Sequence, residues 1–336
     1  ENLPAGRQGW KIKTIKFPYL WTQIGLSLEM LFHPVDVLFI PSHVVPFIRS
    51  KNTIVTIHGL EFEFCLKAYS WWERLYMRWS IKNSCRWAKK IIAVSENTKR
   101  DLMKLYKVPE EKISVIYEGY ENNFLNPPLP LGEDARRAGE GMPEDSPSLP
   151  ASLSQGERGQ EKYLLFIGRL EERKNILGII KAFEILKERY KIPHKLILAG
   201  RPGFNYEKIQ SYVSNSSNKS DIILSGFISE AEKWQLLSGA GIFLFPTLYE
   251  GFGIPILEAQ SVGVPVVVGN NSSILEVVSS SAILVNPKNP STIAEAAYKL
   301  ISNQNLREDM IKRGYENVKR FSWEKCAEEV CKLIMN

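Results

Sequence analysis

The feature of this sequence that most constrains its fold is a regular alternation of short apolar runs with helical patterns. The runs are rich in Val and Ile and mostly apolar at every position, which is typical of parallel strands covered by helices on both faces. The pattern therefore predicts an α/β protein. The predicted strands cover residues 12–17, 35–40, 53–57, 91–94, 113–116, 163–167, 195–199, 222–225, 241–245, 264–268 and 282–285.

Helices are predicted between these strands, for example over residues 71–88, 176–189 and 291–302. Ser95 precedes ENTKRDLMKLY and has the position of an N-cap, with Pro109 beyond the expected helix end. The helix over 71–88 is rich in aromatic residues. Their spacing is helical, so we expect them to pack on the sheet, with peripheral membrane contact as the alternative.

The alternation stops over residues 126–160, which are dense in Pro, Gly, Ser and charge. Such a segment cannot bury enough apolar surface to order itself, so we expect a mobile linker or insertion. The flanking blocks predict two open parallel sheets with ligands bound in a cleft at the carboxyl ends of their strands. The expected division is an N-terminal domain over 1–121, the linker over 122–160, a C-terminal domain over 161–319 and a final helix over 320–336.

Composition excludes several other classes of protein. With 44% hydrophobic and 24% charged residues, the chain has the balance of a globular protein. No stretch approaches the roughly 18 to 20 apolar residues of a membrane-spanning helix, and the first residues lack the pattern of a secretory signal. The four cysteines form no CxxC pair, which favours reduced thiols. We expect a cytoplasmic protein.

The excess of positive over negative charge is confined to the first third of the chain. Residues 1–126 hold 18 Lys and Arg against 12 Asp and Glu, which accounts for the whole net charge of +6. This asymmetry suits contact with an anionic membrane surface or a phosphorylated substrate. A solvated basic face without a partner explains it equally well.

The stretch EGFGIPILE, residues 250–258, places two carboxylates around the glycine-rich start of a helix. Gly251 and Gly253 allow close backbone approach, and the free N–H groups at the positive end of a helix bind anions. Carboxylate oxygens accept hydrogen bonds from sugar hydroxyls. Glu250 and Glu258 could therefore hold a hexose and a ribose with phosphates between them. Alternatively, the glutamates merely complement the helix dipole.

A second constellation is FIGRLEERKN, where a strand ends at Gly168 and a helix begins after Lys174. Arg169 offers a planar fork of donors and Lys174 a point charge, which together can neutralise a diphosphate. The alternative is a set of solvated charges beside neighbouring glutamates.

His58 and Gly59 form a third candidate at the carboxyl end of a predicted N-terminal strand. A histidine there faces the cleft and could donate to a substrate hydroxyl or exchange a proton. It could also be a structural residue. His33, His43 and His194 have no comparable setting.

Two nucleotide-binding motifs are absent from the sequence. A dinucleotide fingerprint fails because Ile256 occupies the last glycine position of GxGxxG, and no GxxxxGK[ST] loop is present.

Six stretches of the sequence, taken together, closely resemble glycosyltransferase family 4. They are GRLEERKN, LILAG, GFISEAEKWQLLSGAGIFLFPTLYEGFGIPILEAQSVGVPVV, VTIHGLEFE, IIAVSENTKRDLMKLYKVPEEKISVIYEG and FSWEKCAEEV. The resemblance covers roughly residues 10–121 and 161–333. It implies a GT-B fold, with two Rossmann-like domains whose parallel sheets face a central cleft. It also implies that the final helix, near 321–334, crosses back to pack on the N-terminal domain.

The resemblance also implies roles for individual residues. Arg169 and Lys174 would bind the diphosphate, and Glu250 the donor sugar. Glu258 would bind the ribose hydroxyls, and His58 would sit beside the transferred hexose. Backbone N–H groups of Phe252, Gly253 and Ile254 would contact the phosphate or the sugar, and Phe227 and Ile228 would border the base. The other expected substrate-binding residues are Gly59, Gly168 and Gly251.

The implied reaction is a retaining transfer of a hexose from a nucleotide diphosphate sugar, with no essential metal and no cofactor. The glutamates are not cast as nucleophiles, because the leaving phosphate would help to deprotonate the acceptor on the same face. The sequence looks most like mannosyltransferases of cell-surface polysaccharide synthesis. GDP-mannose is therefore the expected donor, with UDP- and dTDP-sugars left open, and a glycan or lipid-linked saccharide the expected acceptor.

The sequence departs from the family pattern in three places. Nothing before Trp10 supplies the usual first strand and glycine-rich loop, so we expect a shortened N-terminal domain. Gly59 stands where Asp is frequent after the histidine, and Glu118 stands where Asn is frequent. A noncatalytic nucleotide-sugar-binding relic is therefore an alternative to the transferase, as is an epimerase or a phosphorylase on the same fold.

Overall fold

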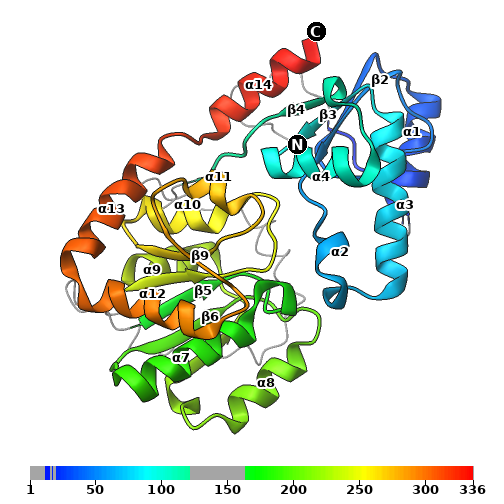
Figure 1. Cartoon of the computed structure of the whole chain (residues 1–336). Helices are drawn as coiled ribbons and strands as arrows, with labels where there is room; N and C mark the ends of the chain where they lie inside the picture. The colour runs from blue at the N-terminus through cyan, green and yellow to red at the C-terminus, as the bar shows by residue number, and fades with distance from the viewer. Residues whose placement is uncertain (1–11, 16, 18–19, 122–162, 336) are drawn as a thin grey trace.

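The computed structural model describes residues 12–15, 17, 20–121 and 163–335 (Figure 1). The predicted linker over 122–160 lies outside these residues. So do residues 1–11, on which the expectation of a missing first strand depends.

The N-terminal sheet contains four parallel strands in the order β1-β2-β3-β4. Its strands are buried on most positions, as their runs of Val and Ile predict. Between and beside them lie a π-helical turn Trp21–Gly25 and helices that flank the sheet. The elements are α1 (Leu26–Phe32), β1 (Val37–Ile40), β2 (Asn52–Ile57), α2 (Glu61–Phe64), α3 (Trp71–Trp87), β3 (Lys90–Ala93), α4 (Glu96–Tyr106) and β4 (Ile113–Val115).

The C-terminal sheet has six parallel strands in the order β10-β9-β8-β5-β6-β7. Helices on both faces bury an apolar core that includes Phe166, Phe183, Phe243 and Phe245. The elements are β5 (Tyr163–Ile167), α7 (Ile176–Tyr190), β6 (Lys195–Ala199), α8 (Tyr206–Asn215), β7 (Ile222–Gly226), α9 (Glu230–Gly239), β8 (Ile242–Phe245), α10 (Ile254–Ser261), β9 (Val266–Gly269), α11 (Ile274–Val278), β10 (Ile283–Val285), α12 (Pro290–Ser302), α13 (Gln304–Val318) and α14 (Trp323–Met335).

Ten of the eleven predicted strands are present, most of them within one or two residues of the predicted bounds. The prediction of a strand over 12–17 is wrong: residues 12–15 and 17 form no regular element, and residue 16 is not described. Lys13 there pairs with Glu29 of α1 rather than with a neighbouring strand. Ser95 does cap α4, because its side chain accepts a hydrogen bond from the Thr98 N–H.

The expectation that the aromatic face of α3 packs on the sheet is also wrong. Trp71, Trp72 and Leu75 are 62%, 71% and 47% exposed. The buried face instead contains small residues and one isoleucine, Ser80, Ile81, Ser84 and Cys85. Helical spacing groups residues on one face but does not say which face is buried. No helix in the described part of the chain is long and apolar enough to cross a membrane.

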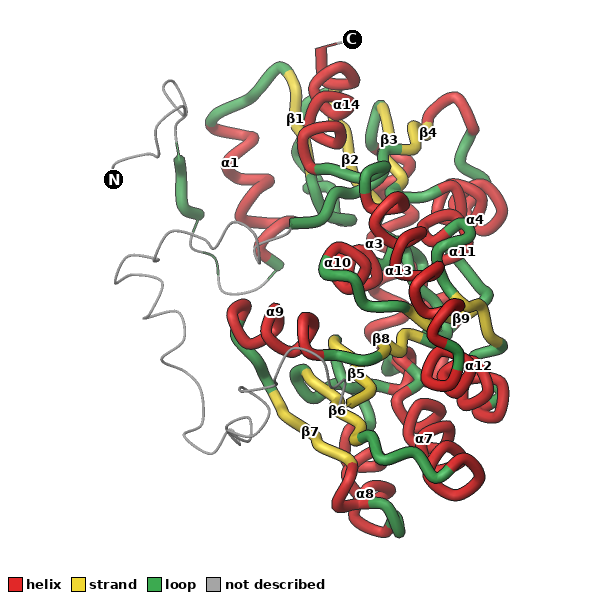
Figure 2. Tube along the Cα trace, turned by 90° about the vertical axis from the view of Figure 1, so that its left-hand side faces the viewer, coloured by secondary structure: helices red, strands yellow, loops and turns green. Residues whose placement is uncertain are grey.

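Helices α13 and α14 run from the C-terminal domain to the N-terminal sheet (Figures 1 and 2). Val330 and Leu333 of α14 pack against Ile54 of β2 and Ile92 of β3. A second apolar cluster, containing Val94, Phe252, Leu257, Val277, Val318 and Phe321, joins the two domains beside α10.

A polar contact adds to the apolar packing between the domains. The carboxylate of Glu276 in α11 accepts hydrogen bonds from the backbone N–H groups of Glu96 and Asn97, at 2.8 and 2.9 Å. These N–H groups begin α4, so Glu276 complements the positive end of that helix. The carboxyl ends of the two sheets are thereby held face to face.

Candidate active site

Glycines allow the strand ends of the C-terminal sheet to approach one another closely. Gly168 follows β5 and Gly200 follows β6, with φ of +151° and +139°. A Cβ on Gly200 would lie only 2.0 Å from the carbonyl oxygen of Gly168. Arg169 directly follows the first of these glycines, so the tight packing fixes the backbone from which it projects.

The loop after β8 brings the EGFG stretch against the N-terminal domain. A Cβ on Gly251 would lie 1.5 Å from the carbonyl oxygen of His58 and 3.2 Å from the Cα of Gly59. Only glycine permits this approach, so the two predicted motifs meet across the domain boundary.

Gly253 is the N-cap of α10, with φ of +125°, and Ile254 is the first residue of the helix. Within the described residues, the N–H groups of Phe252, Gly253 and Ile254 make no hydrogen bond. Such free N–H groups at a helix start favour an anion. The Phe252 side chain is buried in the cluster between the domains, and Ile254 packs against it.

A buried charge network lies beside this helix start. Lys174 donates to Glu250 at 2.7 Å, and Arg173 lies 3.4 Å from the other oxygen of the same carboxylate. Arg173 also pairs with Glu171 at 2.9 Å. Although burial opposes it, the charge of Glu250 raises the pKa of Arg173. The structure thus unites the predicted Lys174 and Glu250 in one ion pair.

Arg169 differs from this network in its exposure. Its side chain is 66% exposed and lies 3.8 Å from Glu171, at the edge of the ion-pair limit. The guanidinium is therefore available to a ligand at low desolvation cost.

Glu258 of α10 has a side chain that is 12% exposed, and it pairs with Lys233 of α9 at 2.8 Å. Burial raises the pKa of Glu258, although the charge of Lys233 opposes this. Lys233 is also held by Glu230 at 2.8 Å. The ion pair thus fixes the position of the Glu258 carboxylate, while burial favours its protonated form.

His58 follows β2 and is held entirely by residues of its own domain. Its Nδ1 lies 2.8 Å from Glu118 and its Nε2 lies 2.7 Å from the carbonyl oxygen of Pro41. Only the doubly protonated ring donates from both nitrogens. Burial lowers the pKa of His58, but the hydrogen bonds to Glu118 and Pro41 raise it above its ordinary value overall.

His43, which the sequence did not single out, packs its ring edge-on to His58 with 5.2 Å between centroids. Burial and the neighbouring His58 lower the pKa of His43 to about 4. Its Nδ1 is buried and has no hydrogen-bond partner among the described residues. Burial thus favours the neutral ring of His43, whereas the hydrogen bonds of His58 favour its charged ring.

Phe227 and Ile228 lie just after β7. Phe227 is 40% exposed and lies under the guanidinium of Arg201, 4.5 Å from its ring centroid. Ile228 packs on the core of the C-terminal domain. A half-exposed ring at a strand end offers a surface on which a planar base can stack.

Arg173, Lys233 and His43 are the residues that sequence reasoning missed. Arg173 carried a usable signal, since it directly precedes Lys174 in the EERK run. The contacts of Lys233 and His43 join elements distant in sequence, which no local spacing reveals.

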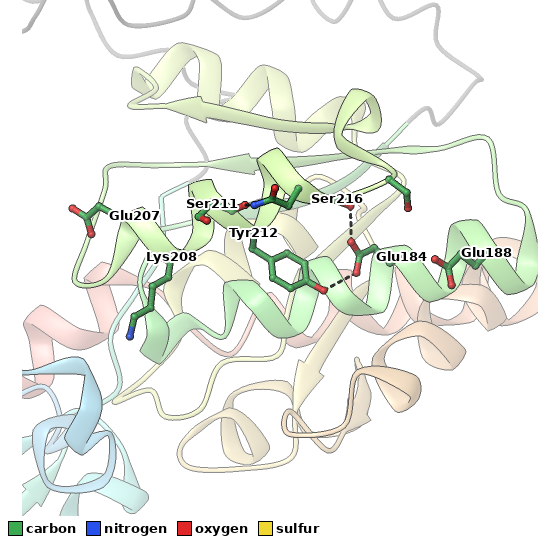
Figure 3. Close-up of a pocket in the computed structure, with 9 residues that line it drawn as sticks. Glu184, Glu188, Glu207, Lys208, Ser211, Tyr212 and Ser216 are labelled. Carbon is green, nitrogen blue, oxygen red and sulfur yellow. Dashed lines mark hydrogen bonds between the residues drawn. The ribbon is translucent and has the colours of Figure 1, made fainter.

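The structure also contains two hollows, one lined in part by Arg173 and one that shares no residue with the charge network. One, of about 670 Å³, opens between the domains beside Arg173 and Tyr249. The other, of about 790 Å³, is a groove between α7 and α8 (Figure 3). In it, Tyr212 and Ser216 both donate to Glu184, which satisfies that carboxylate. No cluster of three metal-ligating side chains occurs in residues 12–15, 17, 20–121 and 163–335.

Comparisons with known proteins bear on both halves of the chain. The family model described as Glycosyl transferases group 1 matches residues 152–317, and that described as Glycosyltransferase Family 4 matches residues 9–123. Two similar proteins are O-antigen chain mannosyltransferase B of Escherichia coli and O-antigen chain mannosyltransferase RfbU of Salmonella typhimurium. They are 27% and 25% identical, over 84% and 86% of this chain and 69% and 70% of their own lengths.

The structure of Anabaena Alr3699/HepE in complex with UDP-glucose is similar in fold. It has a TM-score of 0.70 at 16% identity, over 93% of this chain and 82% of that one. The two facing parallel sheets are those of the GT-B fold. The chain belongs to glycosyltransferase family 4.

Proposed function

We propose that this glycosyltransferase is a retaining hexosyltransferase that moves mannose from GDP-mannose to a glycan or lipid-linked saccharide in cell-surface polysaccharide synthesis. The observation that carries the proposal is the buried Lys174–Glu250 pair beside the free N–H groups of α10. This pair supports the proposal because a cation and a carboxylate that could accept from hydroxyls would then lie near N–H groups that suit a phosphate.

The charges suit the bond that must break. As the glycosidic bond lengthens, negative charge grows on the departing diphosphate and positive charge on the sugar. Arg169, Lys174 and the N-terminus of α10 would stabilise the diphosphate. Glu250 would orient the sugar hydroxyls, and Glu258 the ribose, since carboxylate oxygens accept from hydroxyl groups. No protein nucleophile and no metal is assigned a step.

The choice of mannose and guanine rests on similarity rather than on a contact. Both O-antigen relatives are mannosyltransferases by name. HepE, whose structure contains UDP-glucose, leaves a uridine donor as the main competitor. Phe227 and Arg201 would border the base in either case.

A noncatalytic nucleotide-sugar-binding protein is the second candidate, and one observation favours it. Both ring nitrogens of His58 are engaged within the N-terminal domain, so neither is free for a donor sugar. A catalytic role would require the bond to Pro41 to open when substrate binds.

A cytoplasmic protein that touches the membrane would meet a lipid-linked acceptor. The exposed aromatic residues of α3 support such contact, since Trp and Tyr favour the membrane interface. The positive charge of the first 126 residues would add attraction to anionic lipids.

Thermal unfolding in the presence of GDP, UDP and dTDP tests the proposal. A ligand at about 100 times its dissociation constant adds roughly 2.7 kcal/mol of stability. We expect GDP to stabilise the protein and Glu258→Ala to lose most of that effect. Turnover of GDP-mannose with candidate acceptors then separates the enzyme from the relic. If no nucleotide stabilises the protein, the proposed function is wrong.

A further inference from the structure

Arg173 is a buried cation to which the proposed reaction gives no role. It lies on the 3-10 turn Glu172–Lys174, and its side chain is only 14% exposed. Its guanidinium donates to Glu171 at 2.9 and 3.1 Å and lies 3.4 Å from Glu250. Its backbone carbonyl accepts from the N–H of Leu248 at 3.0 Å, which ties this turn to the loop that carries Glu250.

The network holds as many positive as negative side chains. Glu171 and Glu250 face Arg173 and Lys174, and one carboxylate, Glu250, is shared by both cations. Lys174 takes one oxygen at 2.7 Å and Arg173 takes the other at 3.4 Å. Without a ligand, Lys174 is therefore already committed to Glu250.

A diphosphate changes this balance. To bind it, the Lys174 ammonium must turn some of its donors from Glu250 toward phosphate oxygens. If Lys174 were the only cation on Glu250, this turn would leave a buried carboxylate uncompensated, which is strongly unfavourable. A second cation on the other oxygen removes that obstacle.

We propose that Arg173 is a positioning residue that retains Glu250 while Lys174 turns to the donor diphosphate. This inference rests on the proposed function of the same site. Arg173 is suited to stay behind, because Glu171 and the carbonyl of Tyr249 fix its guanidinium and a planar fork holds its geometry. Lys174 is suited to turn, because an ammonium on a flexible stem has three rotatable donors.

A double-mutant cycle between Arg173→Met and Glu250→Gln tests the proposal. Binding of GDP, UDP and inorganic pyrophosphate is measured by calorimetry on the unmodified protein and on the single and double variants. We expect Arg173→Met alone to weaken diphosphate binding about tenfold, because Lys174 is then held by Glu250. In the Glu250→Gln background, where Lys174 has no carboxylate to leave uncompensated, the same change should cost less than about twofold.

Arg173→Lys is the matched control, since it keeps a cation and should retain diphosphate affinity within about threefold. The midpoint temperature of thermal unfolding, measured for each variant without ligand, checks that the variant is folded. A merely structural Arg173 would change this temperature while leaving the effects on diphosphate binding additive. Equal losses in both backgrounds would mean that Arg173 binds the diphosphate itself, and no loss in either would mean that it has no role. Either result overturns the inference alone. If no diphosphate binds the unmodified protein, the proposed function fails, and the inference fails with it.

Discussion

The two halves of the candidate site hold their charged residues in different ways. In the C-terminal domain, three of the proposed substrate-binding residues are paired across elements: Lys174 with Glu250, and Glu258 with Lys233. In the N-terminal domain, both ring nitrogens of His58 are hydrogen-bonded, Nδ1 to Glu118 and Nε2 to the carbonyl oxygen of Pro41. The C-terminal half of the candidate site thus contains ion pairs for whose charges a ligand can compete, whereas in the N-terminal half hydrogen bonds to both ring nitrogens fix His58.

Because of this difference, we expect substitutions in the two halves to affect nucleotide binding and turnover separately. Changes in the C-terminal pairs should alter nucleotide binding directly, because a ligand competes for the same charges. Changes around His58 should leave nucleotide binding intact and act on transfer or on pH dependence. Substitutions in each half test that division.

Lys174→Met should reduce kcat/KM for the nucleotide sugar by about 100- to 1,000-fold, the usual cost of losing a preorganised donor to a developing anion. The loss of its cation also leaves Glu250 with Arg173 alone. Steady-state kinetics measure the effect. Lys181→Met, a change at an exposed position of α7, is the control and should leave the rate within about twofold. Equal rates for both variants would exclude Lys174 from diphosphate binding.

Gly251→Ala should separate the two halves without removing a charge. Its Cβ would lie 1.5 Å from the His58 carbonyl oxygen, so the loop and the N-terminal domain must move apart. A displacement of this size can cost about 100-fold in turnover. Nucleotide affinity should fall less than turnover does, because Arg169, Lys174 and Glu258 lie outside this loop. Lys181→Met serves again as the control, and a parallel loss of affinity in Gly251→Ala would contradict the division.

Much of the C-terminal half was predictable from sequence, for a physical reason. Buried parallel strands require continuous apolar runs, and their carboxyl ends gather functional loops, so Lys174 and Glu250 could be placed at one edge before any coordinates. The direction in which α3 faces could not be predicted, because Trp71 and Ile81 are both apolar and only the fold decides which is buried. The Lys233–Glu258 and His43–His58 contacts arise from packing between separate elements, which local spacing within one element does not reveal.

Lys233→Gln should make nucleotide affinity depend on pH. Burial already raises the pKa of Glu258, and the charge of Lys233 limits the rise. Without Lys233 the carboxyl should become protonated nearer neutral pH, where it accepts ribose hydroxyls less well. We expect about tenfold weaker nucleotide binding at pH 6 than at pH 8 in this variant, and a flatter profile in the unmodified protein. Calorimetric titration at both pH values measures this, and identical profiles would show that Lys233 does not control Glu258.

Glu118→Gln has the smallest expected effect and tests the contact between His58 and Glu118 in the N-terminal half of the candidate site. Burial opposes the protonated His58 and so lowers its pKa, whereas Glu118, the carbonyl of Pro41 and Glu61 favour it and raise the pKa overall. Because the pKa of His58 is raised in the folded state, its pairing stabilises the protein fully below the unfolded pKa of about 6.5. That stability is lost as pH rises through the higher, folded pKa.

In Glu118→Gln the neutral amide can still accept a hydrogen bond, but the charge that favours the imidazolium is gone. The pKa of His58, followed by NMR of its ring protons, should fall toward its ordinary value, and the decline in unfolding free energy above pH 6.5 should shrink. Because His58 is 40% exposed, solvent screening keeps this difference below about 1 kcal/mol. Nucleotide affinity should not change, since no contact joins Glu118 to the C-terminal ion pairs in the described residues. A large loss of affinity would instead couple the two halves, and the contrast between rearrangeable and fixed charges would no longer explain how the site divides its work.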